Sequence, residues 1–111
     1  MAKYEKTING KFEEVINQLQ NDINNSGISM KLVAESNYTI EDTKIAVRVY
    51  DKYFMRNGNR ASLSLTVVGS HNTIFISAIG AGGGSGVFFN FSLGAEDDMV
   101  EIVRKSIEQM E

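Results

Sequence analysis

The sequence contains no cysteine and only one histidine, and both facts restrict the chemistry open to it. Without cysteine, disulfide bonds, a thiolate nucleophile and cysteine-ligated zinc are excluded, and a reducing compartment is tolerated. His71 has neither a cysteine nor a close carboxylate in its sequence neighbourhood, so it cannot recruit a metal ion or a nucleophile by itself. We therefore place His71 in a turn and expect no metal, no cofactor and no catalytic residue.

Long apolar runs are also missing. Charges alternate from the first residues, Met1–Lys6, which is unlike a signal peptide, and nowhere do about 18 apolar residues follow one another. We therefore expect a cytoplasmic protein without a membrane segment.

Basic charge is scarce except in one short stretch. The net charge is −3, but residues 44–60 contain five Lys or Arg and only one acid, Asp51, whereas the flanking regions are acidic. An acidic surface repels phosphate backbones, and nucleic-acid-binding domains are usually basic. We therefore expect no nucleic-acid partner.

The chain of 111 residues is long enough to form one domain, residues 1–111, with its own core. Its organising stretch is Ala61–Phe91, which begins with two apolar runs, Ala61–Val68 and Thr73–Ile79, separated by turn residues. In the first run Leu63, Leu65 and Val67 alternate with Ser and Thr. This period of two predicts an antiparallel hairpin with one buried and one wet face.

Further segments have the pattern of a strand or a helix. Apolar residues at helical spacing predict two amphipathic helices, Lys11–Asn24 and Gly94–Met110. Alternation predicts additional strands at Lys3–Ile8, Ile28–Leu32, Lys44–Tyr50 and Val87–Phe91. We interpret Val33–Asp42 as a polar connection, with strand residues as far as Ala34.

These elements predict an α+β fold. It has one antiparallel sheet of five to six strands, in the order β-α-β-β-β-β(-β)-α, with both helices on the face of Leu63, Leu65 and Val67. This order resembles the TATA-binding-protein-like topology and the related helix-grip fold. That resemblance implies a topology and no activity.

Short motifs carry a second resemblance, which covers nearly the whole chain. Met1–Glu5, Ala46–Tyr50, Gly58–Arg60, Ser77–Ile79 and Val87–Phe89 are similar to those of a family of small uncharacterised proteins from low-GC Gram-positive bacteria. The resemblance implies no catalytic or binding residue.

The register of Lys44–Tyr50 depends on the turn at Asn57–Gly58. A two-residue turn would place Arg48 on the core face, so we expect a three-residue turn that pairs Val49 with Val67 and Tyr53 with Leu63. Ile45, Val47 and Val49 would then point to the core, and a bulge is expected near Asp51–Lys52.

Glycine is concentrated between the last two predicted strands. A phosphate-binding loop would need a following helix or a Lys-Ser/Thr pair, and here a Phe-rich strand follows, so we expect no nucleotide. The glycines instead predict a mobile hairpin tip. They are Gly80, Gly82, Gly83, Gly84 and Gly86.

The wet face of the sheet is expected to carry apolar and basic side chains together. We predict an interface or ligand face formed by Lys44, Arg48, Tyr50, Phe75, Ile79 and Phe88. The basic residues Lys44, Arg48, Lys52, Arg56 and Arg60 recur every four positions and would either share this face as an anion-binding row or form a solvated surface.

Three functions are compatible with these patterns. The first is a non-enzymatic interaction module that self-associates, as a homodimer, through its outer sheet face. The alternative is a carrier that binds an apolar or anionic small molecule in a pocket between sheet and helices. An enzyme with dispersed residues has the least support, because no catalytic constellation is present.

Overall fold

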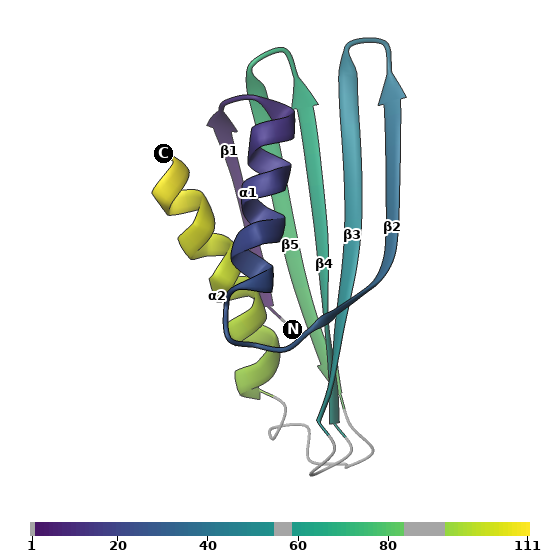
Figure 1. Cartoon of the computed structure of the whole chain (residues 1–111), viewed down its shortest axis with the longest axis vertical. Coiled ribbons are helices and arrows are strands. Elements are labelled where there is room, and N and C mark those ends of the chain that lie inside the picture. Colours follow the sequence, from purple (N-terminus) through teal and green to yellow (C-terminus); the bar gives the residue numbers. More distant parts are fainter. Residues whose placement is uncertain (1, 55–58, 84–92) are drawn as a thin grey trace.

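Strand, helix, four strands and helix follow one another in the computed structural model, which describes residues 2–54, 59–83 and 93–111. The bounds of these elements are β1 (Ala2–Asn9), α1 (Phe12–Asn24), β2 (Lys31–Ile40), β3 (Thr43–Phe54), β4 (Asn59–Ser70), β5 (Thr73–Gly83) and α2 (Leu93–Met110). The five strands form one antiparallel sheet in the order β1-β5-β4-β3-β2. Both helices lie on one face of it (Figure 1). The predicted fold class and element order are therefore confirmed.

The hydrophobic core lies between the helices and the β1-β5-β4 part of the sheet. On β4, Leu63, Leu65 and Val67 are fully buried while the residues between them are partly exposed, as the alternation predicts. The helices contribute one apolar stripe each. The buried members of these stripes are Val15, Ile16, Leu19 and Ile23 of α1 and Met99, Val100, Val103 and Ile107 of α2. Ser106 donates a 2.5 Å hydrogen bond to Asp22 and so links the two helices.

Two glycines on the helix face let the helices approach the sheet closely. A Cβ at Gly80 of β5 would lie 2.7 Å from the backbone oxygen of Glu96 in the first turn of α2. A Cβ at Gly69 of β4 would lie 2.7 Å from the ring of Phe12 at the start of α1. Both distances are shorter than a real Cβ contact, so the helix positions depend on these glycines.

The strand β2 occupies Lys31–Ile40, where we expected a polar connection after Ala34. That prediction was wrong. All ten residues of β2 are exposed, because β2 pairs only with β3 at the sheet edge and neither helix extends over it (Figure 1). A strand with no buried face has no reason to alternate apolar and polar residues, so its sequence carries no strand signal.

The predicted register of β3 was also wrong. Arg48 pairs with Leu65 and Tyr50 with Leu63, so both side chains lie on the helix face, and Ile45, Val47 and Val49 lie on the other. The register runs unbroken from Thr43↔Ser70 to Phe54↔Asn59, and Val49 pairs with Ser64 where Val67 was predicted, three positions away. A shift by an odd number of residues reverses which side chains point to the core.

The expected bulge near Asp51–Lys52 is absent from the described pairing of β3 with β4. A register shift lies instead in β2, between Leu32 and Ala34, where it faces the pair Tyr50 and Val49. Bulges are frequent at sheet edges, and β2 is the edge strand.

The glycine segment is partly strand. Gly80, Gly82 and Gly83 belong to β5, and Gly80 is buried under α2, so these three are strand residues and not part of the hairpin loop that we expected. Gly84 and Gly86, the predicted strand Val87–Phe91 and Arg56 lie outside the described residues.

The β4–β5 hairpin closes through the two residues His71 and Asn72, since Ser70 pairs with Thr73. His71 has a φ of 57°, a left-handed conformation suited to a tight turn. The expected turn position of His71 is confirmed. Among the described residues, neither helix is long and apolar enough to cross a membrane.

Candidate functional site

The structure divides five of the six predicted site residues between two faces. Lys44, Arg48 and Tyr50 lie on the helix face, because they pair directly with Gly69, Leu65 and Leu63. Phe75 and Ile79 lie on the opposite side, which we call the outer face, and Phe88 is outside the described residues. The prediction of one shared face was therefore wrong for this set, because the register of β3 is displaced. Two separate surfaces must be considered.

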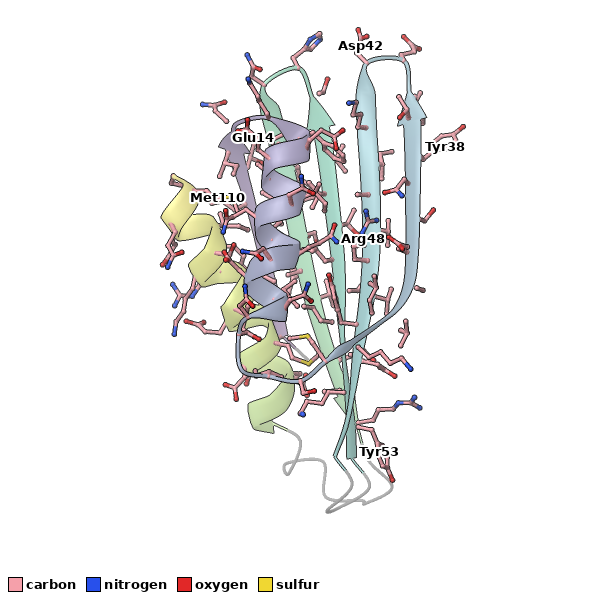
Figure 2. All side chains as sticks on the ribbon, viewed as in Figure 1. Glu14, Tyr38, Asp42, Arg48, Tyr53 and Met110 are labelled. Carbon is pink, nitrogen blue, oxygen red and sulfur yellow. The ribbon has the colours of Figure 1, made fainter. Side chains whose placement is uncertain are left out.

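The outer face carries a continuous apolar row. Cross-strand pairs join Tyr38 to Ile45, Ile45 to Val68 and Val68 to Phe75, so the row crosses four strands from β2 to β5. Tyr38 is 62% exposed and Phe75 is 37% exposed. Figure 2 shows Tyr38 pointing away from the body of the sheet. Soluble proteins seldom leave such a continuous apolar surface in water without a partner.

More apolar side chains flank this row. Ile40 lies beside it at the end of β2 and is half exposed, and further along the sheet Val49 and Ile79 lie on either side of Ser64, with which both pair. Of the seven exposed large hydrophobic residues in the described chain, five lie on the outer face, namely Tyr38, Ile40, Tyr53, Phe75 and Ile79. Within the described ranges, no helix packs on this side (Figure 1).

Several polar groups of the outer face are bound to one another. Asp51 accepts hydrogen bonds from Ser62 at 2.6 Å and from Arg60 at 3.0 Å. Ser77 donates to Glu5 of β1 at 2.9 Å. These pairs use some of the polar side chains of the face within the chain, and the apolar row is the feature of the outer face that remains to be explained.

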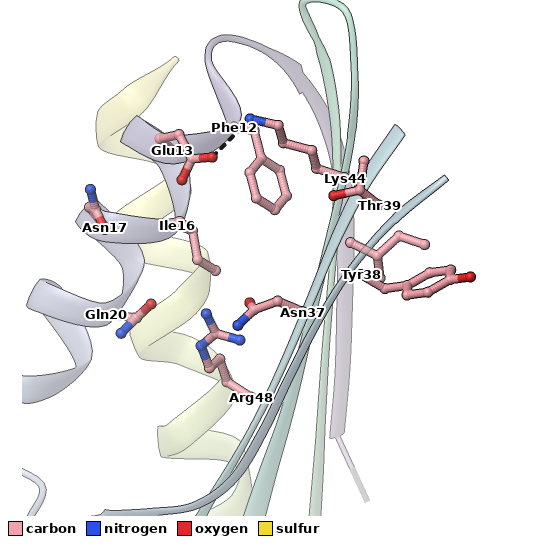
Figure 3. A pocket seen from close by; sticks show the side chains of 11 residues that line it. Phe12, Glu13, Ile16, Asn17, Gln20, Asn37, Tyr38, Thr39, Lys44 and Arg48 are labelled. Carbon is pink, nitrogen blue, oxygen red and sulfur yellow. Dashed lines mark hydrogen bonds and ion pairs between the residues drawn. The ribbon is translucent and has the colours of Figure 1, made fainter. Parts of the chain in front are cut away.

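The second surface is a groove on the helix face, between α1 and the uncovered strands β3 and β2. It has a volume of about 550 Å³. Figure 3 shows Phe12 and Ile16 projecting from α1 toward the strands, while Arg48 and Asn37 rise from β3 and β2 toward the helix. One end is closed by an ion pair between Lys44 and Glu13, 3.0 Å apart.

Arg48 lies at the floor of the groove and is only 7% exposed. Its Nη1 donates to the carbonyl oxygens of Val47, at 3.0 Å, and Ser36, at 3.2 Å. Its Nε is buried 3.3 Å from Oε1 of Glu35 but makes no hydrogen bond among the described residues. Glu35 is itself half exposed. Among the described residues, the buried guanidinium thus has a single, poorly aligned carboxylate, that of Glu35, as its ion-pair partner, which is a costly arrangement for a charge.

Tyr50 is buried beside Arg48 on the same face of β3. Burial raises the pKa of its phenol above the usual value of 10.0; the Arg48 guanidinium lowers that pKa, and the Glu35 carboxylate raises it further. Tyr50 is therefore a core residue and not the surface aromatic that we predicted.

The predicted basic row is divided by the same register. Lys44, Arg48 and Lys52 share the helix face of β3, whereas Arg60 pairs with Tyr53 and lies on the outer face. The single shared row was therefore wrong. Sequence reasoning also missed Glu35 and Asn37, because they fall in the stretch interpreted as a connection and no periodic signal identifies them.

Within the described residues, no three His, Asp or Glu side chains converge into a group that could hold a metal ion.

The chain belongs to a family of unknown function (DUF6054), whose model matches residues 1–111. This agrees with the resemblance to an uncharacterised family. No curated protein matches the sequence.

Two solved structures are similar to the fold over nearly the whole chain. One is TTHA0849 from Thermus thermophilus, with 10% identity, a TM-score of 0.31 and coverage of 98% of this chain and 97% of that one. The other is the di-domain ARO/CYC StfQ from the steffimycin biosynthetic pathway, with 11% identity and the same TM-score. This chain spans 45% of StfQ. Similarity at this level carries no argument about function.

Proposed function

We propose that this protein is a non-enzymatic bacterial interaction module of the cytoplasm that self-associates through the outer face of its sheet. The observation that carries the proposal is the apolar row from Tyr38 to Phe75, which crosses four strands without a covering helix in the described chain. Burial of such a surface is the dominant favourable contribution to protein association.

The size of the outer face suits a dimer. The longest described strands have 12 residues, or about 40 Å at about 3.3 Å per residue, and five strands about 4.8 Å apart give a width of about 24 Å. The product, about 950 Å², is comparable with the roughly 800 Å² that each partner buries in a standard interface. A second copy could therefore cover the whole apolar surface.

A two-fold arrangement also fits the composition of the face. In an isologous dimer the same patch meets itself, so apolar side chains must be opposed by apolar side chains. The row of Ile45, Val68 and Phe75 lies toward the β4–β5 turn end of the face, and the next row of cross-strand pairs carries Thr66 and Ser77. Interfaces commonly combine an apolar patch with hydrogen-bonding side chains beside it.

The test is the solution mass of the wild-type protein and of two matched variants, measured by sedimentation at increasing concentration. Phe75→Glu places a charge on the apolar row, and Leu32→Glu places the same charge at a residue that is equally exposed, 37%, but pairs with Tyr50 on the helix face. We expect a wild-type dimer, a Phe75→Glu monomer and a Leu32→Glu dimer, because a desolvated unpaired charge is costly only inside the interface.

A wild-type protein that stays monomeric at about 100 μM, well above the dissociation constant of an ordinary weak interface, would contradict the proposal. So would equal dissociation of both variants, which would place the contact away from the outer face. Unchanged far-ultraviolet circular dichroism of the variants provides the folding control.

A further inference from the structure

The groove between α1 and the β3–β2 edge has features of a ligand site that are independent of the outer face. Its volume of about 550 Å³ lies within the range of about 300–1,000 Å³ that small-molecule sites occupy. One wall offers the apolar side chains Phe12 and Ile16, and the floor offers the buried cation Arg48. An apolar wall facing one fixed charge is the usual composition of a site for a small amphipathic ion.

The donors of Arg48 indicate the chemistry of that ion. Nη1 is occupied by two backbone carbonyls, while Nε makes no hydrogen bond among the described residues. A carboxylate binds a guanidinium through two parallel N–H donors. The edge of the Arg48 guanidinium that carries Nε is therefore suited to bind a carboxylate. The amides of Gln20 and Asn37, on both sides of the guanidinium in Figure 3, could hydrogen-bond the same group.

Glu35 already stands where such a ligand would bind. Its Oε1 lies 3.3 Å from Nε of Arg48 without forming a hydrogen bond, and its side chain is 53% exposed. A half-exposed carboxylate on an edge strand can move into water at little cost, whereas Arg48 is fixed by the backbone of two strands. Glu35 is therefore a replaceable counter-ion.

From these contacts we propose that the groove binds a small organic carboxylate with an apolar group. The carboxylate displaces Glu35 and pairs with Arg48, and the apolar group packs against Phe12 and Ile16. This inference goes beyond the proposed self-association and does not depend on it, because the groove and the outer face lie on opposite sides of the sheet.

Phenylacetate is a suitable probe, and phenylacetamide is its neutral control of nearly the same shape. Binding is followed by amide chemical shifts in a titration of the full chain. We expect phenylacetate to shift the amides of Arg48, Asn37 and Ile16 and to bind at least about tenfold more tightly than phenylacetamide, because only the acid can form the charge-assisted pair.

Three variants separate this proposal from a purely structural role of Arg48. Arg48→Met should weaken phenylacetate binding at least about tenfold, and Glu35→Gln should strengthen it severalfold, because the competing charge is removed. Phe75→Glu, on the outer face, should leave the affinity unchanged even where it abolishes self-association.

Equal binding of acid and amide, weaker binding by Glu35→Gln, or shifts confined to the outer face would each overturn the proposal. Absence of any shift at about 10 mM phenylacetate would do the same, because an adapted site should bind a probe of this size at millimolar concentration or better.

Discussion

Arg48 carries a buried charge at a position of β3 whose buried neighbours on the helix face are apolar or aromatic. It pairs with the fully buried Leu65 and lies beside the buried Tyr50, but it carries a charge whose nearest carboxylate, on Glu35, is half exposed and poorly aligned. Residues that bind a ligand are often retained in spite of a cost in stability. Stability measurements can therefore show whether Arg48 serves the fold.

We expect Arg48→Met to leave the free energy of unfolding within about 1 kcal/mol of the wild type, or to raise it. Replacing an imperfectly paired buried ion by an apolar side chain of similar length is often neutral or stabilising. Denaturant unfolding measures the change, with Glu35→Gln as the matched variant. A loss of about 3–5 kcal/mol would show instead that Arg48 belongs to a structural ion pair.

Tyr50 gives the fold a dependence on alkaline pH. Burial raises the pKa of its phenol, so the folded state holds this proton more tightly than the unfolded state does. The resulting stabilisation is fully present below the ordinary pKa of 10.0 and is lost as the pH rises through the higher pKa of the folded state.

We therefore expect the free energy of unfolding to fall above pH 10.0 and to fall less in Tyr50→Phe, which has no proton to lose. Denaturant titrations between about pH 8 and 11 compare the two proteins. Parallel pH profiles for wild type and Tyr50→Phe would show that the phenol is not responsible.

At the level of elements, two glycines set the distance between helices and sheet, but their substitution should have unequal costs. A Cβ at Gly80 would meet the backbone oxygen of Glu96, whereas a Cβ at Gly69 would first meet the ring of Phe12. The backbone oxygen of Glu96 can move away only if α2 moves, whereas the Phe12 ring can move by a change of its side-chain torsion angles.

We expect Gly80→Ala to destabilise the fold by about 1–3 kcal/mol, the usual cost of overpacking, and Gly69→Ala to cost less. Thermal or denaturant unfolding of the two variants gives the comparison. A Gly80→Ala protein as stable as the wild type would mean that α2 is not packed closely against β5 at Gly80.

The elements also show where sequence reasoning succeeds. The hairpin of β4 and β5 and both helices could be predicted, because each has one buried and one wet side and so carries a periodic signal. Strand β2 has no buried side, and it could not be distinguished from a loop. The failure is a physical consequence of its place at the uncovered edge of the sheet.

Strand β3 illustrates a different limit. Its apolar residues Ile45, Val47 and Val49 alternate as a core face would, but they belong to the outer face, and the helix face receives Lys44, Arg48 and Tyr50. Alternation reveals two faces but does not say which of them is buried, and the register that decides it is displaced by three positions from the predicted pairing. The candidate groove could not be predicted from the sequence for this reason, because Arg48, at its floor, was predicted to lie on the outer face.

On the scale of the whole molecule, the sheet has two incompletely covered surfaces with different chemistry. The helices cover β1, β5 and β4 on one side, leaving the groove at Arg48, and the outer side carries the apolar row from Tyr38 to Phe75 next to rows that contain Ser and Thr. We propose a small carboxylate as the ligand of the first surface and another copy of the chain as the partner of the second. Each assignment can fail without the other.

The central claim is that the outer face is buried against itself, and intermolecular contacts measure this most directly. An isotope-filtered NOE spectrum of a mixture of labelled and unlabelled protein, at about 0.5 mM, detects only side chains that touch the other copy. We expect intermolecular signals at the methyl groups of Ile45, Val68 and Ile79 and none at Leu32 on the opposite face. A spectrum without intermolecular signals, or with signals at Leu32 but not at the outer-face methyl groups, would contradict the claim.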